Sequence, residues 1–243
     1  MDTAALLFPV VSALRAARDG REYVLQDAAV VDALAGILPA DLLSLNDLDV
    51  AGQQDTTLCL FNCGVPGGSF AAFWDHFPKS LTCCYTERQA KLRTEVMRTS
   101  DFYSDRQWHS TGMYSECLHP AGVEQEMIMP LPAPPGVARR LVFFRPPGSR
   151  FSDAERDAAV LLQPHIAEAL RAHGRREAAR LLTERQLQLL RLSVGGYDNN
   201  AIARQLRISP STVRKHLENV YARLNVTSRT AAAARAFPDI TWS

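Results

Sequence analysis

A run of basic and polar side chains near the C-terminus could read the edges of base pairs in duplex DNA. The segment 209–224 is predicted to be an α-helix whose first turn Ser209 can cap. At about 100° per residue its aliphatic side chains form one narrow stripe, and the opposite arc carries Arg214, Lys215 and Glu218. A helix that is buried on one side and presents compact polar groups on the other fits the major groove, which is wide enough for an α-helix.

The segments around this helix predict a helix-turn-helix. Thr183 and Gln186 form a capping box at the start of a helix that ends at a pair of glycines. Asp198 can cap a second helix, and only Arg207 and Ile208 lie between its end and the cap of the third. Another short helix is expected before the last proline of the chain. Together these helices predict a small all-α domain.

Residues in this region keep the spacing of a known family. The matching positions have fixed offsets without gaps over residues 180–237 and read Leu182-Thr183-x-Arg185-Gln186, Ala201-Ile202-Ala203, Ile208-Ser209-x-Ser211-Thr212-Val213-x-Lys215-His216 and Asn219-Val220-Tyr221-x-x-Leu224-x-Val226-x-Ser228-Arg229. The pattern resembles the LuxR-type DNA-binding domain. It departs from that family at Gln186, where Glu is usual, and where Tyr197, Asn200 and Asn225 replace a commoner aliphatic residue, a charged residue and a glycine.

The resemblance implies which residues meet DNA. It places Arg214, Lys215 and Glu218 against base edges, where Arg and Lys favour guanine and Glu can accept a hydrogen bond from cytosine N4. It implies phosphate contacts that set the register for further side chains, namely Thr212, His216, Asn219 and Arg223. For His216 the simpler alternative is a bridge between two helices. The last helix, 229–237, is a candidate dimer contact, and a homodimer would read two half-sites about 10 bp apart.

The distribution of charge agrees with a nucleic-acid partner at this end of the chain. Positions from 175 onward hold twelve of the 27 lysines and arginines but only five of the 26 aspartates and glutamates. The chain as a whole carries a net charge of +1, so the positive charge is concentrated where the motif lies. Neutralisation of phosphates dominates affinity for DNA. The alternative is a helical bundle used for protein contact, an adaptor that keeps the fold without binding specific DNA.

Aromatic residues of the first part of the chain are candidates for the wall of a small-ligand pocket. Such pockets have apolar walls with a few polar groups such as those of Tyr and Trp. The candidates are Phe61, Trp74, Tyr85, Tyr103, Trp108 and Phe143. The alternative for each of them is that it fills the core. Homoserine-lactone receptors of the LuxR family have a Trp-x-x-x-Tyr spacing and a later Asp-Pro. Here Pro78 follows Trp74 and Asp-Pro does not occur, which argues against an acyl-lactone ligand.

Other chemistries are less well supported by the pattern. Asp47 and Asp49 follow two expected helices rather than an opening strand, which argues against a phosphorylated receiver domain. The five cysteines and nearby histidines do not give a clear zinc-binding pattern, and buried, reduced thiols are expected instead. Gly-x-Ser-x-Gly, a phosphate-binding loop and His-Glu-x-x-His do not occur. We therefore expect no metal, no cofactor and no enzymatic activity.

The order of expected elements indicates an α+β sensor module before the helical domain. Helices are expected at 4–17, 24–38, 70–77, 104–118 and from 152, and strands at 42–50, 57–63, 94–99, 123–129 and 139–145. Ser104 can cap the helix that follows it, and Ser152 with Glu155 predicts a capping box. The strand 123–129 alternates like a half-buried strand and is expected to form a hairpin with 139–145. This order resembles GAF-like, or more loosely PAS-like, domains. The predicted domains are a regulatory module at 1–174 and the LuxR-type domain at 175–243.

The sequence thus predicts a transcriptional regulator that binds double-stranded DNA. The first domain would respond to a small molecule or partner whose identity the pattern does not give, and the protein is expected to be a homodimer. An apolar run long enough for a membrane span and a basic leader before an apolar segment are both missing from the sequence, so a cytoplasmic location is expected.

Overall fold

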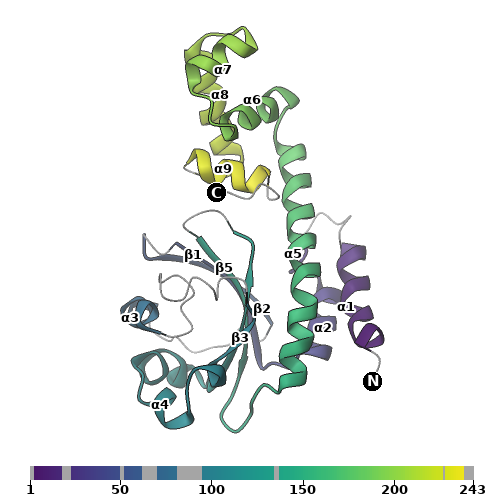
Figure 1. Cartoon of the computed structure of the whole chain (residues 1–243), viewed down its shortest axis with the longest axis vertical. Coiled ribbons are helices and arrows are strands. Elements are labelled where there is room, and N and C mark those ends of the chain that lie inside the picture. Colours follow the sequence, from purple (N-terminus) through teal and green to yellow (C-terminus); the bar gives the residue numbers. More distant parts are fainter. Residues whose placement is uncertain are drawn as a thin grey trace. The chain divides into compact units, whose positions relative to one another are not determined.

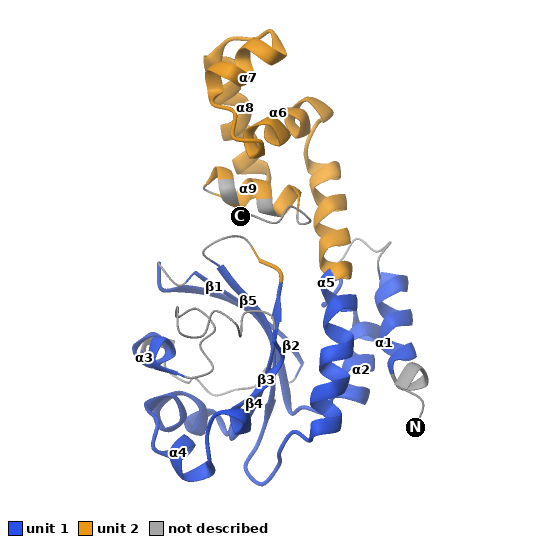
Figure 2. Cartoon of the chain, viewed as in Figure 1, with its two compact units in different colours: residues 1–131, 136–167 blue, residues 132–135, 168–243 orange. Residues whose placement is uncertain are grey.

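The chain forms two compact units, which Figure 2 colours separately. Unit 1 consists of residues 1–131 and 136–167, and unit 2 of residues 132–135 and 168–243. The computed structural model describes residues 3–17, 23–49, 52–61, 70–80, 95–133, 137–226 and 228–237. The change of unit falls within α5 (Asp153–Leu181), a continuous helix of 29 residues. The domain boundary expected after residue 174 stays a prediction.

Unit 1 is built on an antiparallel sheet of five strands in the order β2-β1-β5-β4-β3. The strands are β1 (Leu42–Asp49), β2 (Gln54–Phe61), β3 (Met97–Arg98), β4 (Gln125–Leu131) and β5 (Val137–Arg145). The expected hairpin is confirmed, with Met127 opposite Phe143 and Met129 opposite Leu141. The half-buried strand expected at 123–129 is wrong, because every residue of β4 is buried on both faces of the sheet.

Helices cover both faces of this sheet (Figure 1). On one side lie α1 (Thr3–Ala17), α2 (Ala28–Ile37) and α5, and on the other α3 (Phe70–His76) and α4 (Asp105–His109). Gln163 of α5 donates to the carbonyl of Pro130 in β4 at 2.7 Å. Covering both faces explains why β4 is buried along its whole length, and it gives unit 1 the α+β class that the sequence predicts.

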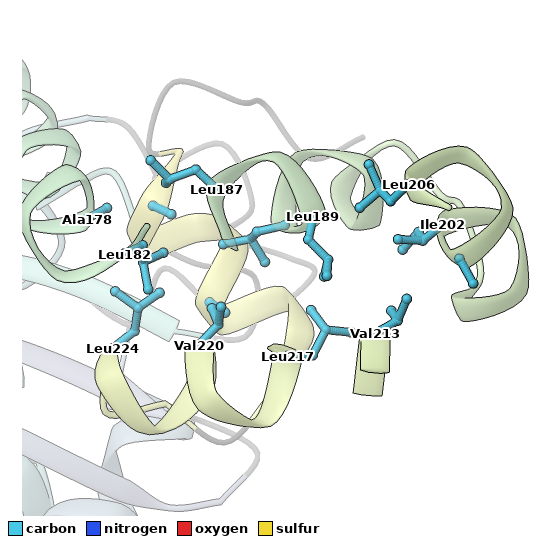
Figure 3. Close-up of a cluster of buried hydrophobic side chains, with 14 residues drawn as sticks. Ala178, Leu182, Leu187, Leu189, Ile202, Leu206, Val213, Leu217, Val220 and Leu224 are labelled. Atoms are coloured by element: carbon cyan, nitrogen blue, oxygen red, sulfur yellow. The ribbon is translucent and has the colours of Figure 1, made fainter. Parts of the chain in front are cut away.

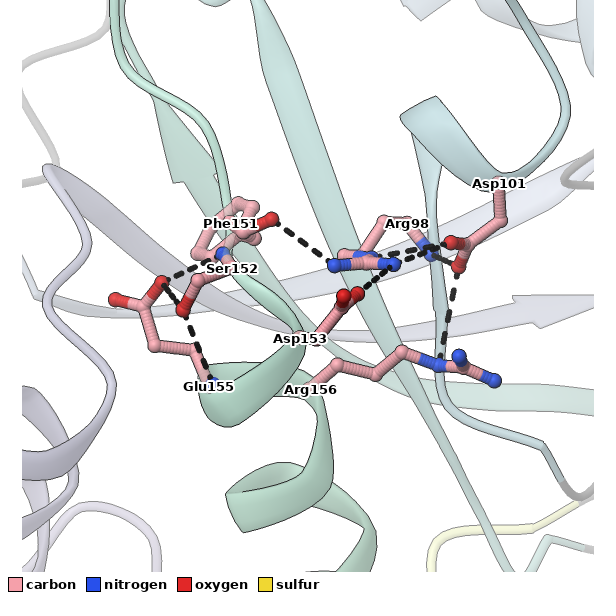
Figure 4. A network of polar contacts seen from close by, with 7 residues as sticks. All are labelled: Arg98, Asp101, Phe151, Ser152, Asp153, Glu155 and Arg156. Atoms are coloured by element: carbon pink, nitrogen blue, oxygen red, sulfur yellow. Dashed lines mark hydrogen bonds and ion pairs between the residues drawn. The ribbon is translucent and has the colours of Figure 1, made fainter.

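A polar network fixes the start of α5 on this sheet (Figure 4). Arg98 of β3 donates to the carbonyl of Phe151 at 3.1 Å and pairs with Asp101 and Asp153 at 2.8 and 2.9 Å. The expected capping box is present, since the Glu155 carboxylate accepts from the backbone N–H of Ser152 at 2.7 Å. The first turn of α5 is therefore tied to strands that lie far away in the sequence.

The helix expected from Ser104 to Leu118 is interrupted. Ser104 caps α4 as predicted, but α4 ends at His109 and the chain continues as a π-helical segment, η4 (Met113–Leu118). The hydroxyls of Ser110 and Thr111 donate to the carbonyls one turn earlier, each at 2.7 Å, and so satisfy the end of α4. Gly112 lies against the ring of His76, and a Cβ at this position would come within 2.1 Å of that ring. Close packing of α3 against η4 therefore depends on a glycine.

Unit 2 contains four short helices after the end of α5. They are α6 (Glu184–Val194), α7 (Asn199–Leu206), α8 (Pro210–Arg223) and α9 (Arg229–Ala236). Across the described ranges, the helices are all too short or too polar to cross a membrane.

Candidate nucleic-acid interface

Each helix of the helix-turn-helix begins at the cap that the sequence predicts. The hydroxyl of Thr183 accepts from the N–H of Gln186 at 3.3 Å, and the Gln186 side chain accepts from the N–H of Thr183 at 3.0 Å. Asp198 accepts from the N–H of Ala201 at 2.7 Å, and Ser209 from that of Thr212 at 3.1 Å. These bonds satisfy N–H groups that have no partner within the helix.

The turn between α7 and α8 is closed by backbone hydrogen bonds. Arg207 has a φ of 53°, in the left-handed region, and its N–H donates to the carbonyl of Arg204 at 3.3 Å. The N–H of Ile208 donates to the carbonyl of Ala203 at 3.0 Å. Since the next residue is the cap Ser209, α8 leaves the turn in a fixed direction.

The predicted aliphatic stripe anchors α8 in the core of unit 2 (Figure 3). Val213, Leu217, Val220 and Leu224 are at most 5% exposed. They face side chains of α6 and α7, among them Leu189, Ile202 and Leu206. Full burial of an aliphatic side chain contributes about 1.5–3 kcal/mol. The core therefore holds α8 by one face and leaves the other free.

The three side chains predicted to read bases lie on that free face. Arg214, Lys215 and Glu218 are exposed. Within the described part of the chain, none of them forms a hydrogen bond or an ion pair through its side chain. A guanidinium, an ammonium and a carboxylate are thus presented within two turns of one helix. All three groups are free to bind another molecule.

The predicted phosphate contacts fall into two groups. Asn219 and Arg223 are exposed, whereas Thr212 and His216 are partly buried. The hydroxyl of Thr212 lies 2.7 Å from that of Ser209, beside the cap of α8. The roles of all four in binding phosphate stay predictions.

Arg223 has an internal role that the sequence pattern does not reveal. Its Nη1 donates to the carbonyl of Leu181 and to Oε1 of Gln186, both at 3.1 Å. The same oxygen of Gln186 accepts from the N–H of Thr183, so one amide closes the capping box and holds the end of α8. One feature of the sequence points to this contact. Gln186 is at a position where the LuxR-type pattern usually has Glu, and a Glu there would pair with the same arginine.

Two further arginines hold the helices of unit 2 together. Arg185 donates to the carbonyl of Leu206 at 2.5 Å, which ties α6 to the end of α7. Arg229 donates to the carbonyl of Tyr197 at 2.6 Å and bonds the hydroxyl of Ser193. Part of the positive charge of this unit therefore serves folding rather than binding.

Of the aromatic residues predicted to line a pocket, the structure gathers three. Trp74, Tyr103 and Trp108 belong to one apolar cluster with Phe77 and Tyr114, on the face of the sheet that α3 and α4 cover. The ring of Trp108 lies 5.4 Å from that of Tyr103 and 5.7 Å from that of Tyr114, measured between centroids. Trp108 also donates from Nε1 to the carbonyl of Glu124 at 2.7 Å.

The remaining candidates do not join this cluster. Phe143 is completely buried, but it alternates with Val142 and so points to the opposite face of the sheet, toward α5. Phe61 is 40% exposed at the end of β2. Tyr85 lies outside the described residues. The register of β5 places Phe143 on the face that α5 covers, and the sequence alone does not show which helices cover each face of a buried strand.

Polar side chains that the sequence did not single out lie on the cluster side of the sheet. Asn46 is buried, donates to the Thr57 hydroxyl at 2.9 Å and accepts from Ser44 at 3.3 Å. The guanidinium of Arg140 lies 5.1 Å from the ring centre of Phe77. Burial raises the pKa of Glu126, against the opposing effect of Arg140. The signal in the sequence was the alternation of Ser44 and Asn46 with the leucines of β1, whereas Arg140 and Glu126 follow no such alternation in their strands.

A second polar group lies where β4 begins. Tyr114 donates to Glu124 at 2.8 Å, and His109 lies 2.5 Å from the other oxygen of the same carboxylate. Burial, together with the hydrogen bond to Glu124, raises the pKa of Tyr114. These contacts connect α4, η4 and β4.

The cysteines differ from the expectation of reduced thiols. Cys59 is disulfide-bonded, and its partner lies outside the described residues. Cys117 is a free, buried thiol whose pKa is raised by burial and by nearby carboxylates. The expectation of a reduced thiol is therefore wrong for Cys59. Among the described side chains, His, Cys, Asp and Glu nowhere gather in threes that could hold a metal ion.

Comparison with known proteins agrees with this geometry. Residues 180–236 match the model of "Bacterial regulatory proteins, luxR family". The monoamine regulon transcriptional regulator of Klebsiella aerogenes is 35% identical over 89 residues, which are 36% of this chain and 39% of the relative. The match to this curated relative thus spans well under half of its length.

Solved structures resemble the chain over most of its length. SdiA in complex with octanoyl-rac-glycerol has a TM-score of 0.55 and 16% identity, covering 97% of this chain and 96% of that one. Escherichia coli SdiA in another crystal has a TM-score of 0.49 and 17% identity, covering 97% and 100%. The first of these likenesses shows a shared fold, an α+β region followed by a helical domain. The match to the family model and the geometry of α6 to α9 together show that residues 180–236 form a luxR-type helix-turn-helix domain.

Proposed function

We propose that the protein regulates transcription by binding duplex DNA through α8 in the major groove. The observation that carries the proposal is the free face of α8, where Arg214, Lys215 and Glu218 are exposed on a helix held by its other face. The match of residues 180–236 to the luxR family model and the excess of basic residues after position 174 support the same partner.

The chemistry of each side chain gives it a role. Arg214 and Lys215 donate to O6 and N7 of guanine, and Glu218 accepts from N4 of cytosine. Thr212, His216 and Asn219 contact phosphates and set the register, whereas Arg223, for which the sequence predicts the same role, is bound inside unit 2 through Nη1. The proposal includes no catalytic step.

The first unit acts as a sensor, GAF-like in its order of elements, that responds to a small effector. Support comes from the aromatic cluster around Trp108 and from the buried polar groups of Asn46 and Arg140 on the same face of the sheet. The related SdiA structure holds octanoyl-rac-glycerol, a small molecule with an apolar chain and polar hydroxyls. An effector of the same general kind, apolar with a few polar groups, suits the side chains of unit 1.

The active form is a homodimer that works in the cytoplasm, where bacterial DNA lies. Two copies of α8 would read half-sites about 10 bp apart. The helix α9 is the candidate contact between copies.

Selection from a random duplex library tests the proposed function. The full-length protein should enrich one short sequence, and a dimer should enrich an inverted repeat. The selected and a scrambled duplex are then titrated at several salt concentrations. Equal affinity for both at every salt concentration would reject sequence-specific binding and leave an adaptor as the better account.

A further inference from the structure

The cations of unit 2 fall into two classes when each is sorted by its contacts. One class is engaged inside the unit: Arg171 and Arg175 pair with Glu168, Arg191 with Glu184 and Arg235 with Glu177, while Arg176, Arg185, Arg223 and Arg229 donate to backbone or side-chain oxygens. Within the described residues, the other class makes neither a hydrogen bond nor an ion pair through the side chain: Arg180, Arg204, Arg207, Arg214 and Lys215.

Apart from Arg180, the unengaged cations lie close together in the chain. All fall between positions 204 and 215, which span the last turn of α7, the tight turn and the first half of α8. Arg204 and Arg207 are exposed. Arg207 is two residues before the cap Ser209, so its Cα lies within about 7 Å of the Cα of Ser209 at the start of α8.

Arg207 lies in a backbone conformation that does not favour arginine. Its φ of 53° is a conformation that glycine and asparagine adopt at less cost than arginine. The turn itself therefore does not explain an arginine, and its exposed guanidinium makes no contact inside the described unit. An arginine in an unfavourable backbone conformation, where glycine would fit at lower energy, points to a role for its side chain.

We propose that Arg204 and Arg207 bind DNA phosphates beside the groove that α8 enters. The inference rests on the proposed function and extends the interface from α8 to α7 and the turn. In helix-turn-helix proteins the first helix crosses the DNA backbone, and α7 is the first helix of the motif in this domain. A guanidinium with free donors binds a phosphate by two parallel hydrogen bonds.

Salt dependence of binding tests the proposal in the full-length protein. We expect R204Q and R207Q each to weaken binding to the selected and the scrambled duplex by the same factor. Each should also reduce the magnitude of the slope of log K against log salt by about 0.9 for each bound copy, or about 1.8 for a dimer, because one neutralised phosphate is lost per copy. R207G serves as a second variant, because glycine relaxes the left-handed backbone while removing the same charge. It should reproduce R207Q if the side chain acts on DNA rather than on the turn.

The matched control is R180Q, which removes another exposed arginine without a side-chain hydrogen bond or ion pair among the described residues, near the end of α5. It should leave both the affinity and the slope unchanged. Helix content from circular dichroism verifies that each variant is folded.

The outcomes separate this inference from the proposed function. Wild-type protein that prefers the selected duplex, with unchanged slopes in R204Q and R207Q, overturns the inference alone. A slope that R180Q lowers as much as they do also overturns it, because the effect would then come from net charge. Loss of affinity for the selected duplex only would assign the arginines to bases and overturn the phosphate contact. Wild-type protein without sequence preference would reject the proposed function itself.

Discussion

Changing Gln186 to Glu should stabilise unit 2, because a single buried oxygen at this position serves three donors. Oε1 of Gln186 accepts from the N–H and the hydroxyl of Thr183 at 3.0 and 3.2 Å and from Arg223 at 3.1 Å. Gln186 is 5% exposed, and within the described residues its amide nitrogen makes no side-chain hydrogen bond that a carboxylate would lose.

The expected gain follows from the charge that Glu introduces. Hydrogen bonds to a charged group contribute about 1.5–3 kcal/mol, against about 0.5–1.5 kcal/mol for neutral pairs. A negative charge in the first turn of α6 contributes roughly 0.3–1 kcal/mol through the helix dipole. Desolvation of the carboxylate offsets part of this sum. We expect a net gain of about 1 kcal/mol in the free energy of unfolding near neutral pH, from the difference between these contributions.

The gain should depend on pH in a defined direction. Arg223 and the N–H donors favour the ionised form, so the pKa of the new carboxyl should be lower in the folded state than in the unfolded state. The stabilisation is then complete above the unfolded pKa of about 4.3 and is lost as the pH falls through the folded value.

A double-mutant cycle measures the contribution of Arg223 directly. The four proteins are the wild type, Q186E, R223Q and the double variant, each unfolded by urea at pH 7 and at pH 4. The gain from Q186E should largely disappear in the R223Q background. A gain that persists there, or a loss of stability in Q186E at pH 7, would refute the reasoning.

Three further changes follow from the same structure. Lys215→Ala should weaken binding to the selected duplex by about 1–3 kcal/mol and relax preference at one base pair, whereas a uniform loss on scrambled DNA would assign Lys215 to a phosphate. Leu217→Ala should lower the free energy of unfolding by about 2–5 kcal/mol, while the exposed neighbour in Glu218→Ala should stay within about 0.5 kcal/mol; equal effects in urea titrations would contradict the assigned faces of α8. The pKa of Glu155 is lowered, since hydrogen bonds from Arg145 and Ser152 outweigh the effect of burial. Glu155→Gln should therefore cost stability above about pH 4.3 and progressively less below it, and the same dependence in the exposed control Asp157→Asn would contradict this cause.

The sequence predicts the part of this fold that depends on local signals. The caps Thr183, Asp198 and Ser209 and the stripe that contains Val213 act within one or two turns of a helix, and the structure confirms each of them. The α+β class follows from the order of the elements for the same reason, since the spacing of apolar residues distinguishes a helix from a strand within a short window.

Contacts between distant residues were not predictable in this way. Gln186 and Arg223 are 37 positions apart, and only the packing of α8 against α6 brings them together. Phe143 is of a residue type that often lines pockets, but the pairing of β5 with its neighbours places it on the other face of the sheet from Trp108. The need for glycine at position 112 comes from the ring of His76, which belongs to another helix. Each of these outcomes is set by tertiary packing, which overrides what a short window of sequence shows.

The net charge of a DNA-binding unit overstates the charge that it offers to DNA. Arg185, Arg223 and Arg229 are held by carbonyl or amide oxygens, so moving them to phosphates would cost the hydrogen bonds that join the helices. The salt slope of binding counts only cations that replace condensed counterions. If Arg204 and Arg207 are the phosphate contacts, each copy contributes a slope of about −1.8 and a dimer about −3.6. A count of all basic residues in the unit would give a much steeper slope, so the measured value distinguishes arginines that build the domain from arginines that bind.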